Sequence, residues 1–273
     1  MKNVVSFSGG RTSAKLTLLA IEKFGVENTV VIYMDTGAEH PKTYEFIKSL
    51  VEVFGVNLVC LRGDFSKPLG KGVGYSVVDL SDCKFDLKPF SEMMGKYGVP
   101  YIGGMFCTDR MKLKPFQKYC KDHVGKDITT WLGIRVDEPR RLTEKKGIKY
   151  LAEICEDEKQ DIISWWSEQV FDLSIPEWLG NCVFCPKKSN LKLAAAQRDE
   201  PELYEEWLSM LYSDSVRIDD NTGHHSKMYR GEQSLESLIA TFDGSTGEEI
   251  KARIRGGKMV DTNSCSESCE VFN

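Results

Sequence analysis

The chain has 273 residues and a formal net charge of −5 at pH 7, from 36 Lys and Arg against 41 Asp and Glu. This acidic balance argues against a protein that coats nucleic acid through electrostatics alone, and a content of 41% hydrophobic and 28% charged residues excludes global disorder. The longest apolar runs, such as residues 29–34, are far shorter than the ~20 residues that span a bilayer, and the first residues lead straight into a strand-like segment rather than a signal peptide. We therefore expect a cytoplasmic protein without a membrane segment.

Strands and helices are predicted to alternate along the first part of the chain. Residues 4–7 form a buried apolar run that predicts a strand, and a Ser-Gly-Gly sequence ends it before residues 12–24 resume with apolar residues at helical spacing. A second strand is predicted over residues 28–34, a helix begins at Pro41, and residues 57–61 predict a third strand. This alternation is typical of βαβ units, so we expect an α/β fold: a parallel sheet with helices on both faces.

The middle of the chain is less regular. Residues 63–81 are rich in glycine and predict a loop over the sheet edge, whereas residues 84–97 and 109–124 predict helices. Residues 127–133 predict a further strand, and the charged stretch 143–161 predicts exposed chain.

The last third of the chain is predicted to be mainly helical. Residues 191–211 carry apolar residues at helical spacing, which predicts a helix or a helical pair. The tail from Ser245 is rich in Gly, Ser and Thr and is expected to be mobile until a contact orders it. We therefore divide the chain into an α/β domain over residues 1–190, which contains the Ser-Gly-Gly sequence, and a helical extension with a cysteine-containing tail over residues 191–273.

The Ser-Gly-Gly sequence between the first strand and the first helix has the composition of a phosphate-binding loop. Its glycines let the backbone approach a ligand, and the N–H groups of the following helix start point into the positive end of the helix dipole. The loop lacks the features of a Walker loop and of a Rossmann fingerprint, and the alternative interpretation is an ordinary Gly-Gly turn. The candidate nucleotide-binding residues here are Ser6, Ser8, Gly9, Gly10, Arg11, Thr12 and Ser13.

The ends of two other predicted strands carry further candidates. Asp35 follows the second strand and can hold a ribose hydroxyl, a magnesium ion or the loop itself; alternatively, Asp35, Thr36 and Gly37 merely cap the next segment. Arg135 comes after a later strand and Gly133, where parallel sheets present ligand contacts. Its guanidinium can hold phosphate or sulfate in a bidentate manner.

Nine cysteines are many for a chain in a reducing compartment, which favours metal binding or thiol chemistry. Cys182 and Cys185 have the two-residue gap that lets both sulfurs meet one metal or cluster, and the same spacing fits a redox dithiol. Cys265 and Cys269 lie in a small, polar tail in which exposed thiols suit a redox or nucleophilic role.

Five short blocks occur in a fixed order along the chain. They are SGGRTS at residues 8–13, MDTG at 34–37 with the segment to 46, FCTDRMKLKP at 106–115, GIRVDEPRR at 133–141, and the region 162–186 that ends in CVFCP. In order and spacing these blocks resemble the phosphoadenosine phosphosulfate (PAPS) reductase family of the adenine nucleotide alpha-hydrolase-like (PP-loop) superfamily. The resemblance covers most of residues 4–188 and implies that superfamily's fold with an adenine nucleotide at the first block.

The resemblance also implies an activity. It implies cysteine-dependent sulfur chemistry, above all reduction of a sulfonucleotide such as PAPS or its analogue lacking the 3′-phosphate, with a thioredoxin-like protein as reductant. A second interpretation is an ATP-dependent sulfurtransferase of the ATP pyrophosphatase type, which acts on tRNA or DNA and uses magnesium. A third is a nucleotide-binding protein without turnover, because Thr12 replaces the Asp that many ATP pyrophosphatases of the superfamily carry there.

Roles for individual residues follow from the same resemblance. Lys112 and Arg140 are expected to bind the substrate, and Arg135 to act in catalysis. Cys265 and Cys269 correspond by position to the family's catalytic cysteine near the C-terminus. Cys107 is expected to join Cys182 and Cys185 as ligands of a 4Fe–4S cluster, with zinc as the competitor.

Overall fold

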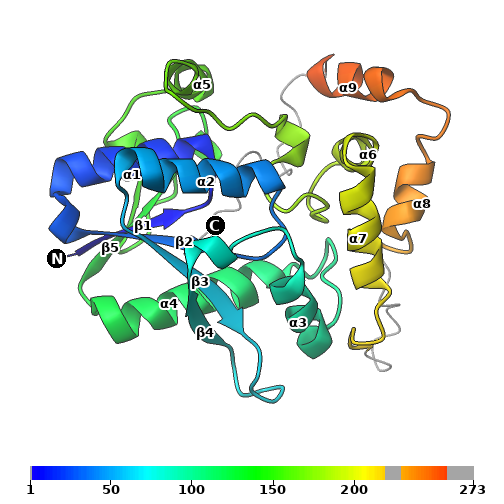
Figure 1. Cartoon of the computed structure of the whole chain (residues 1–273), viewed down its shortest axis with the longest axis horizontal. Coiled ribbons are helices and arrows are strands. Elements are labelled where there is room, and N and C mark those ends of the chain that lie inside the picture. Colours follow the sequence, from blue (N-terminus) through cyan, green and yellow to red (C-terminus); the bar gives the residue numbers. More distant parts are fainter. Residues whose placement is uncertain (1, 219–228, 257–273) are drawn as a thin grey trace.

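The computed structural model describes residues 2–218 and 229–256, and in this part of the chain a six-stranded sheet lies at the centre (Figure 1). The strands are β1 (Lys2–Phe7), β2 (Thr29–Met34), β3 (Leu58–Asp64), β4 (Gly74–Val78), β5 (Ile128–Leu132) and β6 (Ile148–Tyr150). Their order is β4-β3-β2-β1-β5-β6, and every neighbouring pair is parallel except β3 with β4. The end of β1 therefore lies in the middle of the edge where parallel sheets bind ligands.

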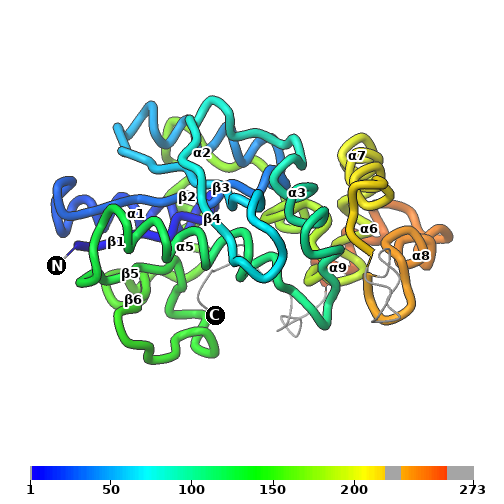
Figure 2. Tube along the Cα trace, turned by 90° about the horizontal axis from the view of Figure 1, so that it is seen from below, coloured from blue at the N-terminus to red at the C-terminus, as the bar shows by residue number. Residues whose placement is uncertain are grey.

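Helices cover both faces of this sheet, as predicted. The first face is covered by α1 (Arg11–Phe24), α2 (Pro41–Phe54) and α5 (Lys159–Ser167), and the opposite face by α4 (Lys114–Tyr119) (Figures 1 and 2). Because successive side chains of a strand point to opposite faces, Val5 and Phe7 pack into the core beneath α1 and α2, whereas Val4 packs with Phe116 of α4. The α/β prediction is confirmed.

The remaining helices form a second apolar core beside the sheet. They are α3 (Lys88–Tyr97), α6 (Asn190–Asp199), α7 (Pro201–Leu211), α8 (Leu235–Ala240) and α9 (Gly247–Gly256). In this core Phe90 and Met93 of α3 pack with Leu193, Trp207 and Leu238 from the C-terminal helices. The C-terminal portion is thus mainly helical, as predicted, while the domain boundary at residue 190 stays a prediction. Within the described ranges, none of the helices combines the length and hydropathy of a membrane span.

Three short elements differ from the sequence-based expectations. The glycine-rich stretch 63–81 contains the edge strand β4, which runs antiparallel to β3, so the sheet is mixed rather than wholly parallel. The stretch 143–161 contains β6, and the segment beyond Ser245 contains α9. Edge strands of three to five residues, half-exposed as in β4, show too little alternation for a periodicity to be detected.

The helix predicted over residues 109–124 is present but has an uneven winding. Wide π-type turns, Thr108–Leu113 and Cys120–Val124, flank α4 on either side. Pro115 has no N–H to donate, and it lies where the first wide turn passes into α4. Cys107 immediately precedes the first wide turn, Thr108–Leu113.

Candidate functional site

The loop that follows β1 is held in shape by Ser13. The Ser13 hydroxyl accepts from the Ser8 N–H at 3.1 Å, lies 2.9 Å from the Ser8 hydroxyl and donates to the Gly10 carbonyl at 3.0 Å. Gly10 is the N-cap of α1, no described side chain caps this helix start, and its first turn has no acidic residue. The N–H groups of the first turn are therefore available to an anion.

Two glycines make this loop possible. Gly9 has a φ of +83°, and a Cβ atom there would lie 3.1 Å from both Ile47 Cδ1 and Thr43 Cγ2. A Cβ on Gly133 would lie 3.0 Å from Ser13 Cα, so this glycine lets the end of β5 press against the loop backbone. The sequence analysis had named both glycines as candidate residues of the site. The third candidate, Ser6, is buried near the end of β1.

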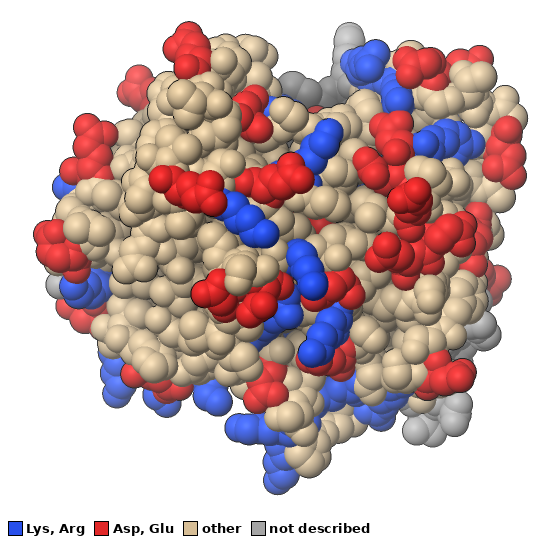
Figure 3. All heavy atoms as spheres, in the orientation of Figure 1, with Lys and Arg blue, Asp and Glu red and all other residues tan. Residues whose placement is uncertain are grey.

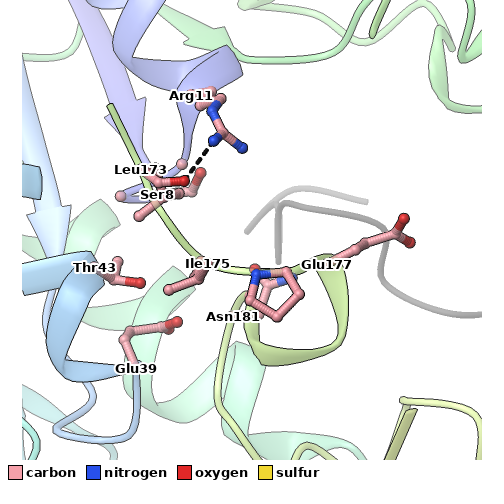
Figure 4. A pocket seen from close by; sticks show the side chains of 12 residues that line it. Ser8, Arg11, Glu39, Thr43, Leu173, Ile175, Glu177 and Asn181 are labelled. Carbon is pink, nitrogen blue, oxygen red and sulfur yellow. Dashed lines mark hydrogen bonds between the residues drawn. The ribbon is translucent and has the colours of Figure 1, made fainter. Parts of the chain in front are cut away.

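A pocket opens in front of the loop (Figure 4). Its lining residues come from three segments: Ser8, Gly9, Gly10 and Arg11; Glu39 and Thr43; and Leu173, Ile175, Pro176, Glu177, Gly180 and Asn181. Figure 4 shows Glu39 and Thr43 pointing into this space, whereas the Glu177 carboxylate points away from it. Sequence reasoning missed Glu39 and Asn181; the Gly-Asn pair that ends with Asn181 was a usable turn signal, since Asn181 adopts a φ of +57°.

Arg11 holds one wall of the pocket in place. Its guanidinium donates to Asp172 through Nε at 2.7 Å and Nη2 at 2.9 Å, and it also donates to the Leu173 carbonyl (Figure 4). The Trp166 indole donates to the Arg11 carbonyl at 2.9 Å. The predicted residue Arg11 therefore lines the pocket, with its charge paired to Asp172.

Arg135 lies directly behind the loop. It is 5% exposed, and its Nη1 donates to the Thr12 hydroxyl at 3.2 Å. Asp137 receives a bidentate pair from the same guanidinium at 2.8 and 3.2 Å, and the Glu138 carboxylate lies 3.5 Å from Nη1. Arg135 thus holds the start of α1 in place through the Thr12 hydroxyl. The other arginine candidate, Arg140, is exposed in a short turn.

Asp35 is a fully buried hub at the end of β2. Its Oδ1 accepts from the Gly37 N–H at 2.9 Å and the Tyr44 hydroxyl at 3.0 Å, and its Oδ2 accepts from Arg62 Nε at 2.7 Å. Burial, together with the charge of Asp35, raises the pKa of Tyr44 well above its usual range. Asp35 and Gly37 therefore shape the connection from β2 to α2 and do not line the pocket.

The Cys182 thiol contacts Glu39, one of the residues that line the pocket. It donates to Glu39 Oε1 at 3.8 Å and lies 3.7 Å from the Thr36 hydroxyl. Backbone contacts fix this arrangement, because Glu39 and Cys182 form an antiparallel bridge and Val183 donates to the Ala38 carbonyl at 3.0 Å. The connection from β2 to α2 and the Cys182 segment are thus neighbours, although they are far apart in sequence.

Two buried lysines lie close to Glu39 and the 182–185 segment. Lys112 Nζ is 3.8 Å from Glu39 Oε1. Lys188 is fully buried, and its ammonium donates to the Trp178 carbonyl at 2.6 Å and the Val183 carbonyl at 2.9 Å. Burial lowers the pKa of Lys188 to about 8, against the opposing effect of Cys185, Cys182 and Glu39.

The three predicted metal ligands share one region of the fold. Burial raises the pKa of Tyr229, and the charges of Cys185, Cys182 and Cys107 act in the same direction. Yet within residues 2–218 and 229–256, no group of three or more Cys, His, Asp or Glu side chains is arranged to hold a metal ion. The described donors alone therefore do not fit a 4Fe–4S or zinc site, which stays a prediction; Cys265 and Cys269 lie outside the described residues.

Comparison with known proteins agrees with this geometry. Residues 2–67 match the phosphoadenosine phosphosulfate reductase domain. An uncharacterized nin region protein of Escherichia phage lambda is 46% identical over 277 residues, which cover 100% of this chain and 96% of that relative. Two uncharacterized proteins of Methanocaldococcus jannaschii are 24% and 27% identical over 76% of this chain, which spans only 41% and 46% of their lengths. The chain belongs to the phosphoadenosine phosphosulfate reductase family, as its five blocks predicted.

Proposed function

We propose that this protein binds a sulfated adenine nucleotide with its phosphates on the Ser8–Ser13 loop and reduces the bound sulfate group to sulfite. The observation that carries the proposal is the position of Glu39. Its carboxylate lines the pocket in front of the loop and accepts the hydrogen bond of the Cys182 thiol. Glu39 therefore links the pocket in front of the Ser8–Ser13 loop to the Cys182 thiol.

The electrostatics of the pocket favour a phosphate group at the start of α1. Gly9 and Gly10 bring the backbone to the pocket surface, and the helix dipole favours a negative charge at this end. Arg135 stands behind Thr12 and holds the Thr12 hydroxyl in place, without occupying the space in front of the loop. These features suit the phosphates of an adenine nucleotide.

A small sulfonucleotide fits the charge distribution better than a polyanionic acceptor. On the face shown in Figure 3, acidic side chains gather over α7, where Glu202, Glu205 and Glu206 are all exposed. Such a face repels a nucleic acid backbone. We therefore favour sulfonucleotide reduction over transfer of sulfur to tRNA or DNA.

Two measurements on the full chain test the proposal. Equilibrium binding is measured with PAPS, its analogue lacking the 3′-phosphate, ATP and AMP, and sulfite is assayed after addition of a dithiol reductant. We expect binding of a sulfonucleotide and sulfite release. Release of AMP and pyrophosphate from ATP only when tRNA or DNA is present would support the sulfurtransferase instead, and tight binding without any turnover would support a non-catalytic protein.

A further inference from the structure

We propose that Glu39 and Thr43 hold the ribose hydroxyls of the bound nucleotide, so that the protein selects a sulfonucleotide without a 3′-phosphate over PAPS. The inference rests on the proposed function, because it takes the phosphates next to the ribose to lie on the Ser8–Ser13 loop. It names which of two sulfonucleotides the pocket accepts and which side chains make the choice.

Thr43 brings a buried hydroxyl to the pocket. The side chain is 4% exposed, and its Oγ1 has no hydrogen-bond partner among the residues that the structure describes. Thr43 lines the pocket, and Figure 4 shows its side chain pointing into it. A buried polar group without a partner is unfavourable, so a ligand gains affinity by supplying the hydrogen bond that this hydroxyl lacks.

Glu39 adds a carboxylate to the same part of the pocket. It precedes Thr43 by four residues, and Figure 4 shows both side chains pointing into this space. Its Oε1 accepts from the Cys182 thiol at 3.8 Å and lies 3.8 Å from Lys112 Nζ, but Lys112 does not line the pocket. A ligand therefore meets a negatively charged acceptor here, which attracts a hydrogen-bond donor and repels a second anion.

The lining of the pocket offers little positive charge for a second phosphate. Among the described residues that line it, Arg11 is the one with a cationic side chain. Its guanidinium is already engaged by the Asp172 carboxylate and by the Leu173 carbonyl. The start of α1 remains as an anion site, and in the proposed function it holds the 5′-phosphate. A 3′-phosphate turned toward Glu39 would therefore meet a like charge without a cation from this lining to offset it.

The ribose is the part of the nucleotide that can reach these two side chains. A Cβ atom on Gly9 would lie 3.1 Å from Thr43 Cγ2, so Thr43 is directly beside the loop. The ribose is joined to the 5′-phosphate, whereas the adenine amino group lies at the far end of the nucleoside. Leu173, Ile175 and Pro176 form an apolar part of the lining that suits the face of the base. Dinucleotide-binding enzymes make a comparable choice, since an acidic side chain on a ribose hydroxyl selects NAD and an arginine accommodates the phosphate of NADP.

Nucleotides that differ only in the 3′-phosphate test this inference on the full chain. Isothermal titration compares AMP with adenosine 3′,5′-bisphosphate, and sulfite release compares adenosine 5′-phosphosulfate with PAPS. We expect AMP to bind roughly tenfold tighter than the bisphosphate, because like charges at the ribose oppose binding of the latter. The kcat/KM for sulfite release should favour adenosine 5′-phosphosulfate in the same direction.

Substitutions at the two residues separate the charge from the hydrogen bond. Glu39→Gln keeps the shape and an acceptor oxygen, so the preference for AMP should fall to about threefold or less, mainly because the bisphosphate binds better. Thr43→Val should weaken AMP binding roughly tenfold, and Thr43→Ser, which keeps the hydroxyl, should restore it. Glu45→Gln is the matched control, because it removes the same charge from an exposed position of α2 outside the pocket lining and should leave the preference unchanged. The thermal midpoint of each variant shows whether it is folded.

The outcomes distinguish this inference from the proposed function. Equal or tighter binding of the bisphosphate by the parent chain would overturn the inference, and so would an unchanged preference in a folded Glu39→Gln or unchanged AMP binding in Thr43→Val. Sulfite release that favours PAPS would then leave the proposed function standing with the other nucleotide. A clear preference for AMP without sulfite from either sulfonucleotide would keep the ribose contact and overturn the reduction. Failure of all four nucleotides to bind would overturn both.

Discussion

Arg135 donates from Nη1 to the Thr12 hydroxyl at 3.2 Å, and this hydrogen bond joins the end of β5 to the first turn of α1. Thr12 is 4% exposed, so its contribution is to orient the loop rather than to contact solvent. Thr12→Val removes the acceptor while keeping the shape of the side chain, and we expect it to weaken nucleotide binding by roughly tenfold, the effect of ~1.4 kcal/mol. Isothermal titration with PAPS or ATP measures the change in Kd.

Thr17→Val is the matched control for this change. The Thr17 hydroxyl is also buried in α1, where it donates to the Ser13 carbonyl at 2.8 Å, but it is one turn further from the loop. Its removal should lower stability by about 1 kcal/mol without changing Kd. Equal losses of affinity in both variants would contradict the role given to the bond between Arg135 and Thr12.

Gly9→Ala should abolish nucleotide binding. The φ of +83° strains any residue with a Cβ, and this Cβ would also press on Ile47 and Thr43, which moves the loop out of place. Gly70→Ala carries the same backbone strain, with a φ of +84°, but nothing lies within 4 Å of its Cβ. Both variants should lose about 1 kcal/mol of stability from the strain alone, while only Gly9→Ala should lose affinity; retained affinity in Gly9→Ala would contradict this loop as the phosphate site.

The strand, glycine turn and helix start around the Ser8–Ser13 loop were predictable from the sequence because they are local, while nucleotide binding at this loop stays a prediction. Gly9, Gly10 and Ser13 lie within a few residues of one another, and their contacts depend on one strand, one turn and one helix start. The same holds for Gly133, whose place after a strand was visible in the pattern of apolar residues. Short-range periodicity and turn chemistry are the signals that a single chain carries most clearly.

The wall of the pocket could not be predicted in the same way. Glu39 meets Cys182, and Arg11 meets Asp172, across sequence separations of more than 140 residues. No periodic pattern of residues in the sequence links such partners, and only the tertiary fold brings them together. Asp35 is a different case. Its position at a strand end suggested a ligand contact, but its carboxylate accepts three hydrogen bonds from within the protein, which hold the connection after β2 in shape.

Asp172→Asn should loosen one wall of the pocket. The change removes the charge that holds the Arg11 guanidinium in a bidentate pair, so the 172–176 segment is less firmly attached to the loop. We expect faster amide hydrogen exchange in that segment and roughly tenfold weaker nucleotide binding, which corresponds to ~1.4 kcal/mol. Asp157→Asn is the matched control. It breaks the ion pair between Asp157 and Lys15 of α1, and neither residue lines the pocket, so the Kd for the nucleotide should not change. An unchanged exchange pattern in Asp172→Asn would contradict the anchoring role of Arg11.

The ion pair of Lys192 with Glu177 predicts how stability depends on pH. Lys192 Nζ lies 2.7 Å from Glu177 Oε1, and Lys159 Nζ lies 3.1 Å from Oε2. Burial by itself would raise the pKa of Glu177, but the hydrogen bond and charge of Lys192, with help from Lys159, outweigh it and lower this pKa below its usual 4.5. The folded-state pKa is therefore below the unfolded one, so the stabilisation is complete above the unfolded pKa and is lost as the pH falls through the folded value.

Lys192→Met should remove most of this stabilisation. At neutral pH we expect a loss of about 1 kcal/mol in the free energy of unfolding, because Glu177 is still one-third exposed and solvent screens the pair. The difference between parent and variant should shrink as the pH is lowered below the usual pKa of Glu177, since protonation removes the partner charge in both proteins. Urea unfolding at a series of pH values measures this difference. Lys149→Met is the control, because it breaks an exposed ion pair with Glu153. Its difference in unfolding free energy from the parent should be small at every pH. A difference for Lys192→Met that stays constant from neutral to acidic pH would mean that the Lys192 side chain stabilises the fold by packing rather than by its charge.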